Sequence, residues 1–252
     1  MNGDEYIRPP GTYYDILPHP SGTKRAMEIA VVQDHRFAFF YWLKWRNRLG
    51  LPVPSPALIS FDWHEDLAAP CEIECDELNA LDTNDYRSIA FFCWDKLNPL
   101  NDGHILSAAY LDLIGDIYVV CKQDRSASSH FNDVNGKAHA ICCYHSVDEL
   151  LTEVRQSGNA NVFFDIDLDY FTESPDPHGG GEHVRLVPDD DIKAILNPAS
   201  SLFIWMFERL SGMTVATEPK FCGGLVNSNH LVSVVSDALF HPPLLSHRSG
   251  WK

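Results

Sequence analysis

Short apolar runs alternate along the chain with segments whose apolar residues recur at three- and four-residue intervals. The short runs predict buried strands, and the periodic segments predict helices that bury one face. The predicted strands are Glu28–Val32, Pro56–Phe61, Asp116–Cys121, Ala138–Tyr144, Asn161–Leu168 and Met213–Thr217. The predicted helices are His35–Leu49, Asp85–Leu97, His104–Ile114, Ser146–Gln156, a short one from Pro188, Ser201–Leu210 and Ser228–Phe240. This alternation favours an α/β fold with three αβα layers and a mostly parallel sheet.

Local signals define several element ends and the extent of the domain. Asp102 is the predicted cap of the helix that starts at His104, and Ser146 with Glu149 has the pattern of a capping box. Tyr, Pro and Gly are frequent near the amino terminus, so residues 1–27 are expected to be loop-rich. A length of 252 residues suits one well-buried domain, and we expect a single domain over 1–252.

The composition narrows the classes of function. A net charge of −16 argues against a nucleic-acid partner, because phosphate binding requires clustered Lys and Arg. The amino terminus has no basic and apolar leader pattern and no stretch is apolar enough for a membrane span, so we expect a cytoplasmic protein. Seven cysteines without a C-x-x-C pair predict reduced thiols rather than a disulfide framework or a structural zinc site.

Two acidic clusters, about a hundred residues apart, each follow an apolar run. The first contains Asp62, His64 and Asp66, and the second contains Asp165 and Asp167. Alternate side chains of an extended strand point the same way, so each cluster can present its members on one face. In open α/β sheets such strand ends gather at one edge. We therefore expect the two clusters to meet.

Carboxylates packed this densely beside apolar strands repel one another unless cations neutralise them. Oxygen ligands with a few imidazoles suit Mn²⁺ better than an ion that prefers thiolates. A binuclear site needs about six protein ligands, and His35, just after the predicted strand Glu28–Val32, is the best candidate for the sixth. The alternative is that each cluster is a strand running into a polar turn and that His35 is an ordinary histidine at a helix start.

The order of these motifs along the chain resembles that of the ureohydrolase (arginase/agmatinase) superfamily: Asp-His after a first strand, D-x-H-x-D after a second and D-x-D after a later one. The segments V-Q-D-H, S-F-D-W-H-E-D, F-F-D-I-D-L-D-Y-F and A-T-E-P-K-F-C-G-G look closer still to the UPF0489 family. Bacterial members of that family include peptide arginases, which convert arginine residues of ribosomally made peptides into ornithine. The resemblance extends from about Ile29 to His241.

The resemblance implies an arginase-like fold and a centre of two Mn²⁺ ions that activates a hydroxide for attack on a guanidinium carbon. It implies that His35, Asp62, Asp66 and Asp165 hold one ion and that His64, Asp62, Asp165 and Asp167 hold the other, with Asp62 and Asp165 bridging. It also places Glu218 where ureohydrolases have the carboxylate that clamps the guanidinium. Asp169 is a further acid beside the metals, and His104 is the candidate proton donor to the departing amine.

A Gly- and Pro-rich segment, Glu173–His183, follows the second acidic cluster and contains no predicted helix or strand. Such a loop is either a lid that contacts substrate or a surface loop without function. His178 and His183 within it are alternatives to His104 as the proton donor, and each of the three could be an ordinary surface histidine.

The chain departs from ordinary arginases because it is shorter and lacks the loop motifs that grip a free amino acid. This favours an arginine side chain presented on a precursor peptide as the substrate. Three alternatives remain open: a small-molecule ureohydrolase, a deacetylase-like amidohydrolase with one Zn²⁺, and a metal-binding module without catalysis. The deacetylase needs fewer ligands than the chain offers, and the presence of all six candidate ligands argues against a site that has lost its catalysis.

Overall fold

An eight-stranded sheet forms the centre of the computed structural model, which describes residues 6–50, 52–123, 128–181 and 183–252. Its strand order is β1-β2-β10-β7-β3-β4-β6-β5. The strands are β1 (Thr12–Pro18), β2 (Ala26–Val32), β3 (Ala57–Asp62), β4 (Ile117–Cys121), β5 (Ser129–Asn132), β6 (Ala138–Tyr144), β7 (Val162–Asp167) and β10 (Leu210–Ala216). The inner strands run parallel, and β1 and β5 pair antiparallel at the two edges. The predicted mostly parallel sheet is confirmed.

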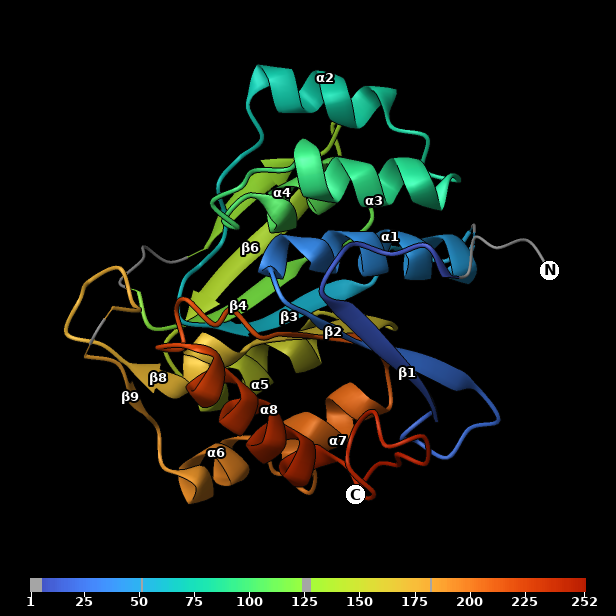
Figure 1. The fold of residues 1–252 in the computed structure, drawn as a ribbon. Coiled ribbons are helices and arrows are strands. Elements are labelled where there is room, and N and C mark those ends of the chain that lie inside the picture. The colour runs from blue at the N-terminus through green and yellow to red at the C-terminus, as the bar shows by residue number, and fades with distance from the viewer. Residues whose placement is uncertain (1–5, 51, 124–127, 182) are drawn as a thin grey trace.

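Helices cover both faces of this sheet (Figure 1). One layer contains α1 (Ala38–Leu49), α2 (Glu72–Ala80), α3 (Tyr86–Asp95) and α4 (His104–Tyr110). The other contains α5 (Val147–Gln156), α6 (Asp189–Ile195), α7 (Ser201–Phe207) and α8 (Leu225–Leu239). The predicted three-layer αβα arrangement is therefore confirmed, and a separate short hairpin joins β8 (Thr172–Glu173) to β9 (Arg185–Leu186).

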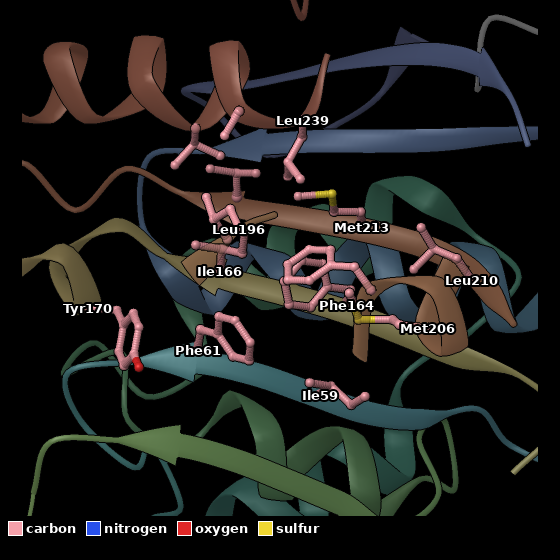
Figure 2. Close-up of a cluster of buried hydrophobic side chains, with 14 of the residues drawn as sticks. Ile59, Phe61, Phe164, Ile166, Tyr170, Leu196, Met206, Leu210, Met213 and Leu239 are labelled. Atoms are coloured by element: carbon pink, nitrogen blue, oxygen red, sulfur yellow. The ribbon is translucent and has the colours of Figure 1, made fainter. Parts of the chain in front are cut away.

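Alternating side chains of the buried strands divide the core into two parts. On β7, Phe164 and Ile166 point into the cluster beneath the α5–α8 layer, and Phe163 points to the opposite cluster under α1. Figure 2 shows Phe61 of β3 beside Phe164 in the first cluster. Burial on both faces explains why these strands read as continuous apolar runs in the sequence. It also places Asp165, next to Phe164 in the chain, on the α1 side of the sheet.

The segment expected to be loop-rich contains a strand instead. β1 (Thr12–Pro18) pairs along its full length with β2. As an edge strand it leaves Tyr13 and Ile16 more than half exposed, so it shows no continuous apolar run. Its pairing partner supplies the backbone hydrogen bonds, and local propensity does not reveal that contact. The short edge strand β5 was not predicted for the same reason. The helix α2 was not predicted because it is mainly polar and buries Leu78 alone.

One predicted helix cap is wrong, and a second lacks its capping hydrogen bond. Gly103, not Asp102, is the cap of α4, and the Asp102 carboxylate accepts a hydrogen bond from the Asn98 amide at 2.7 Å instead. Ser146 is at the cap position of α5, but its side chain makes no capping hydrogen bond there. Among the described residues, no helix has the length and apolar character needed to cross a bilayer. All seven cysteines lie among the described residues and none forms a disulfide there, as predicted; Cys142 and Cys143 are half buried.

Candidate metal centre

The carboxyl ends of four adjacent strands, β2, β10, β7 and β3, meet at one edge of the sheet. A short 3-10 turn that starts at His35 follows β2, and Glu218 follows β10. Asp62 ends β3 and Asp167 ends β7. The predicted clusters therefore lie together, since parallel strands direct their carboxyl ends to the same edge.

His35 lies at the centre of this group and is fully buried. Its Nδ1 atom is 3.0 Å from a carboxylate oxygen of Asp66, 3.3 Å from one of Asp62 and 3.2 Å from one of Asp167. On the opposite side of the ring, Nε2 lies 2.8 Å from Asp165. When Nε2–H donates to Asp165, the Nδ1 lone pair faces three carboxylates, which is the orientation of a metal-ligating imidazole.

His64 repeats this arrangement nearby. Its Nε2 atom is 2.9 Å from the backbone carbonyl of His178, so Nε2–H can donate there. Its Nδ1 atom lies 3.1 Å from Asp169 and 3.5 Å from Asp62. The two carboxylate oxygens of Asp62 thus face different histidines, Oδ2 toward His35 and Oδ1 toward His64. Asp62 is therefore the carboxylate placed between the two groups of ligands.

Asp165 does not have the contacts expected of a bridging ligand. It pairs in register with Ser60 of β3 and Thr214 of β10, inside the sheet rather than at its edge. The Ser60 hydroxyl donates to Asp165 Oδ2 at 2.7 Å, the Thr214 hydroxyl donates to Oδ1, and His35 approaches Oδ2 as well. Both oxygens are thus engaged by protein groups. Asp167 faces His35 in the place expected for Asp165, and Asp169 faces His64 in the place expected for Asp167.

Electrostatics show how strongly this cluster needs positive charge. Burial raises the pKa values of Asp66, Asp167 and Asp169, and a neighbouring carboxylate raises each of them further. Burial works against protonation of His64, but Asp169 and Asp62 outweigh it and raise its pKa to about 12. Adjacent buried acids repel one another, so positive charge bound among them lowers their free energy.

His35 and Asp62 show the same competition between burial and charge. Burial opposes protonation of His35, yet Asp165 and Asp167 raise its pKa well above the usual value. For Asp62, burial favours the neutral acid, but His35 and His64 lower its pKa. Within the described chain, Asp62 Oδ2 and Asp169 Oδ2 are buried without a hydrogen-bond partner. The donor set of the cluster consists of imidazole nitrogens and carboxylate oxygens, these two among them. Such a set fits divalent cations.

Glu218 lies beside the cluster with one carboxylate oxygen held. Its Oε1 accepts a hydrogen bond from the His35 backbone N–H at 2.7 Å and another from the Asn101 side-chain amide at 2.6 Å. Burial raises the pKa of Glu218 to about 7. Both Glu218 and Asn101 have a positive φ, 32° and 65°, so the backbone bends sharply at each. These two hydrogen bonds fix the carboxylate and leave Oε2 for another group.

A hollow of about 510 Å³ opens onto the cluster. Its walls include His64, Asp66 and Asp167 from the cluster, together with Glu218 and His178. The Gly- and Pro-rich loop Glu173–His183 thus borders the hollow at His178, whose backbone carbonyl contacts His64. A Cβ atom at Gly179 would lie 3.1 Å from the Trp63 ring and 3.3 Å from His64 Nε2, so glycine is needed for the close approach.

His104 is not positioned to donate a proton to a substrate. It is fully buried, its ring stacks on Trp42 with centroids 5.4 Å apart, and it is not among the described residues that line the hollow. Burial lowers the pKa of His104 well below its usual value, which favours the neutral imidazole. Its ring centroid lies 4.2 Å from that of His35, so it packs behind a candidate ligand. His183 is exposed and also lies outside the lining, whereas His178 is part of it.

Sequence reasoning missed the residues that support the cluster: Ser60, Thr214 and Asn101. Ser60 is the one hydroxyl in β3, whereas β10 contains Ser211 as well as Thr214. A buried hydroxyl needs a partner, but the acid that lies between Ser60 and Thr214 is set by the strand register, which the sequence does not contain. Asn101 had no local signal either, since it lies in the irregular connection between α3 and α4.

No protein-family model matches the chain, and no curated protein matches it. Among solved structures it is similar to proclavaminate amidino hydrolase from Streptomyces clavuligerus, with 13% identity and a TM-score of 0.47 over 82% of this chain and 60% of the other. It is also similar to arginase from Bacillus subtilis, with 14% identity and a TM-score of 0.40 over 82% of this chain and 70% of the other. The chain thus spans about three fifths of the length of the amidino hydrolase.

Proposed function

We propose that the chain is a hydrolase that binds two divalent metal ions and cleaves a C–N bond of a guanidinium group. The observation that carries the proposal is the placement of two imidazoles on either side of Asp62. Each directs its Nδ1 atom at carboxylates, and Asp62 faces both rings. His35, Asp62, Asp66 and Asp167 would hold one ion, and His64, Asp62 and Asp169 the other. Asp165 then orients His35 rather than binding metal.

Manganese suits this donor set because carboxylate oxygens outnumber imidazole nitrogens and no thiolate takes part. Bound there, a pair of divalent ions supplies the Lewis acidity that makes water a nucleophile near neutral pH. Asp62, with one oxygen directed to each histidine, would hold the two ions at a fixed separation. The His35–Asp165 and His64–His178 contacts keep both rings in the orientation that binding requires.

Glu218 is the proposed clamp for the substrate guanidinium. Its Oε1 is held by two N–H donors, so Oε2 is presented in a fixed direction beside the cluster. A guanidinium donates parallel N–H bonds to a carboxylate, and proximity of its positive charge favours the ionised form of Glu218. The Asn101 side-chain oxygen, buried and without a hydrogen-bond partner in the described chain, can accept a further N–H.

An arginine side chain on a peptide is the substrate that we favour over free arginine or agmatine. A second hollow, of about 450 Å³, shares Glu218 and Asn101 with the first and continues past Pro219 and Leu225. Leu225, 65% exposed, and Leu100, 73% exposed, also line this hollow and give it an apolar rim that suits neighbouring residues of a peptide. Urea and ornithine are the expected products, and a modified arginine loses about 42 Da when an amine replaces its guanidinium.

Urea release tests this function. The protein is stripped with a chelator, reloaded with Mn²⁺ and offered arginine-containing peptides, free arginine and agmatine in parallel. We expect urea from peptides with little from the free compounds, no urea after stripping, and recovery on reloading. Turnover of free arginine or agmatine in place of peptides would identify a small-molecule ureohydrolase.

Glu218→Gln is the matched test of the clamp. Its control is Glu208→Gln, at the exposed carboxyl end of α7. Glu218→Gln should retain both ions but lose most turnover, at a cost of about 3–4 kcal/mol in transition-state stabilisation. Full metal occupancy without turnover of any guanidinium compound in the unmodified protein would leave a metal-binding module as the function. A single ion bound at this cluster, rather than two, would favour the deacetylase-like alternative.

A further inference from the structure

A second group of potential metal ligands lies at the opposite edge of the sheet. Asp112 is in the connection from α4 to β4, Asp133 is in the turn from β5 to β6, and His139 is near the start of β6. A ligand atom from each lies within 4.8 Å of the others. Because this group is at the amino end of β4 and the proposed catalytic cluster is at the carboxyl ends of the strands, the two are separate.

His139 is the residue that indicates a ligand. Its side chain is 1% exposed, and its Nδ1 atom lies 3.1 Å from the Gly115 carbonyl, to which Nδ1–H donates. The lone pair of Nε2 then points the other way, toward Asp133 Oδ2 at 3.7 Å and Asp112 Oδ1 at 3.9 Å. Nε2 is buried and has no hydrogen-bond partner among the described residues. A buried ring nitrogen left without a partner costs free energy, so this site needs an explanation.

The spacing suits an ion better than direct contacts. Separations of 3.7 and 3.9 Å exceed the hydrogen-bond range, so neither carboxylate directly satisfies Nε2. Ligand atoms bound about 2.0–2.2 Å from one metal ion at tetrahedral angles lie roughly 3.3–3.6 Å from each other, so small side-chain shifts would bring both carboxylates into range. Asp133 is preorganised, because its Oδ1 accepts the backbone N–H groups of Asn135 and Lys137 at 2.7 and 2.8 Å. Its Oδ2 is thereby directed at His139.

We propose that Asp112, Asp133 and His139 form a second metal site, which binds one divalent ion of the Zn²⁺ or Mn²⁺ type. One imidazole and two carboxylates are ligands that both ions accept. The bound ion links the β5–β6 turn to the α4–β4 connection and so stabilises the edge of the sheet. This site has no part in the proposed hydrolysis and does not depend on it.

Lys137 is the competitor for this site. Its ammonium lies 2.6 Å from Asp112 Oδ1, and its side chain is half exposed. On metal binding it can move into water at little cost, because an exposed ion pair contributes at most about 1 kcal/mol to stability. Lys137→Met should therefore strengthen metal binding, since it removes the positive charge that the metal ion must displace.

The test uses the full chain with Asp62→Asn and Asp167→Asn, which disable the proposed catalytic cluster. Calorimetric titration with Zn²⁺, and separately with Mn²⁺, should show one ion per chain. Adding His139→Gln should weaken binding at least tenfold, and Asp133→Asn should do the same. His130→Gln, at an exposed position on neighbouring β5, is the control and should leave binding unchanged.

Elemental analysis of the otherwise unmodified chain provides a second measurement, in which His139→Gln should lower metal content by one ion while leaving catalysis intact. Absence of binding in the Asp62→Asn, Asp167→Asn protein would overturn the site. Equal affinities of the His139→Gln and His130→Gln proteins would overturn it as well. If the unmodified chain released no urea but still bound an ion through His139, the proposed hydrolysis would fail and this site would remain.

Discussion

His35 and Asp165 are joined through the Nε2 side of the imidazole, at 2.8 Å, which leaves Nδ1 directed toward the acidic cluster. Asp165 is itself held by hydroxyls of Ser60 and Thr214 from the two neighbouring strands. The sheet thus positions a carboxylate, and the carboxylate positions a ring. A histidine oriented in this way loses little freedom on binding an ion, so Asp165 would strengthen metal binding without being a ligand itself.

Metal content separates the role of Asp165 from that of Asp169. Asp169→Asn should lose about one ion per chain, because Asp169 is proposed to ligate beside His64. Asp165→Asn should keep both ions with affinity weakened about 10–100-fold, the usual cost of removing the partner of a ligating histidine. Elemental analysis after dialysis measures both. Loss of both ions from Asp165→Asn, with none lost from Asp169→Asn, would restore Asp165 as the bridging ligand.

The sequence predicted that the two acidic clusters would lie together, with Asp165 and Asp167 as ligands and Asp169 as a further acid. In the structure Asp167 and Asp169 are the acids of the second cluster that face Nδ1 of His35 and His64. In the run Asp165-Ile166-Asp167-Leu168-Asp169 any two alternate acids can form a pair. The choice depends on where β7 leaves the sheet, and it leaves after Asp167. Strand ends are set by pairing with neighbours, here by Ser60 and Thr214 opposite Asp165, and a single sequence does not contain that register.

Elements buried on both faces were predicted well, and elements at the edges were not. β7 carries a long apolar run because helices cover both of its faces, whereas β1 pairs on one side and leaves Tyr13 exposed. Asn101 was missed for a related reason. It reaches Glu218 across 117 residues of sequence from an irregular connection, and nothing local distinguishes it from other asparagines.

Asn101→Ala should impair catalysis without releasing metal. The change removes one of the two donors to Glu218 Oε1, and hydrogen bonds to charged groups contribute about 1.5–3 kcal/mol. Turnover of an arginine-containing peptide should therefore fall roughly 10–150-fold in kcat/KM. Steady-state kinetics with elemental analysis provides the measurement, and Asn47→Ala, an exposed side chain on α1, is the control. Unchanged kcat/KM in Asn101→Ala would show that Glu218 needs no second donor.

The metal-free protein should lose stability as pH rises from about 4.5 to 7. Burial raises the pKa of Glu218 from 4.5 to about 7, so the folded state holds this proton more tightly than the unfolded chain. The resulting stabilisation is complete below pH 4.5 and is lost as pH rises through 7. Urea denaturation of the chelated protein measures the free energy of unfolding across this pH range. In the Glu218→Gln protein that free energy should fall by roughly 3 kcal/mol less than in the unmodified protein.

The same experiment with Mn²⁺ should give the opposite slope. Ligands must lose their protons before they bind metal, so added Mn²⁺ should stabilise the protein more as pH rises. The raised pKa of His64, about 12, means that its share of the metal-free decline falls above pH 6.5, outside the Glu218 range. Identical slopes of the unmodified and Glu218→Gln proteins between pH 4.5 and 7 would refute the assignment to Glu218.

His178 is the histidine that we now expect to donate a proton to the departing amine, because it lines the hollow and His104 does not. His178→Ala should lower kcat on a peptide by about 10²–10⁴-fold, the range typical of a lost general acid. The His178 backbone carbonyl, which holds His64, is retained in this variant, so metal content should be unchanged. Exposed His230, on α8, provides the control as His230→Ala. Equal kcat in the two variants would exclude His178 as the donor.

Gly179→Ala tests whether the Gly/Pro loop supports the metal centre or only covers it. The new Cβ would lie 3.1 Å from the Trp63 ring and 3.3 Å from His64 Nε2, so the loop or His64 must shift. Gly179 also has a φ of +69°, and an alanine there is strained by about 1 kcal/mol regardless of contacts.

Gly181→Ala is the matched control for that strain, because Gly181 has a φ of +88° and a Cβ there would meet no atom of the described chain within 4 Å. Both variants should lose about 1 kcal/mol of stability in urea denaturation, and Gly179→Ala should lose more. Only Gly179→Ala should weaken Mn²⁺ binding, by roughly tenfold for one of the two ions, since only it disturbs the bond that orients His64. Equal metal affinities of the two variants would mean that the loop covers the site without supporting it.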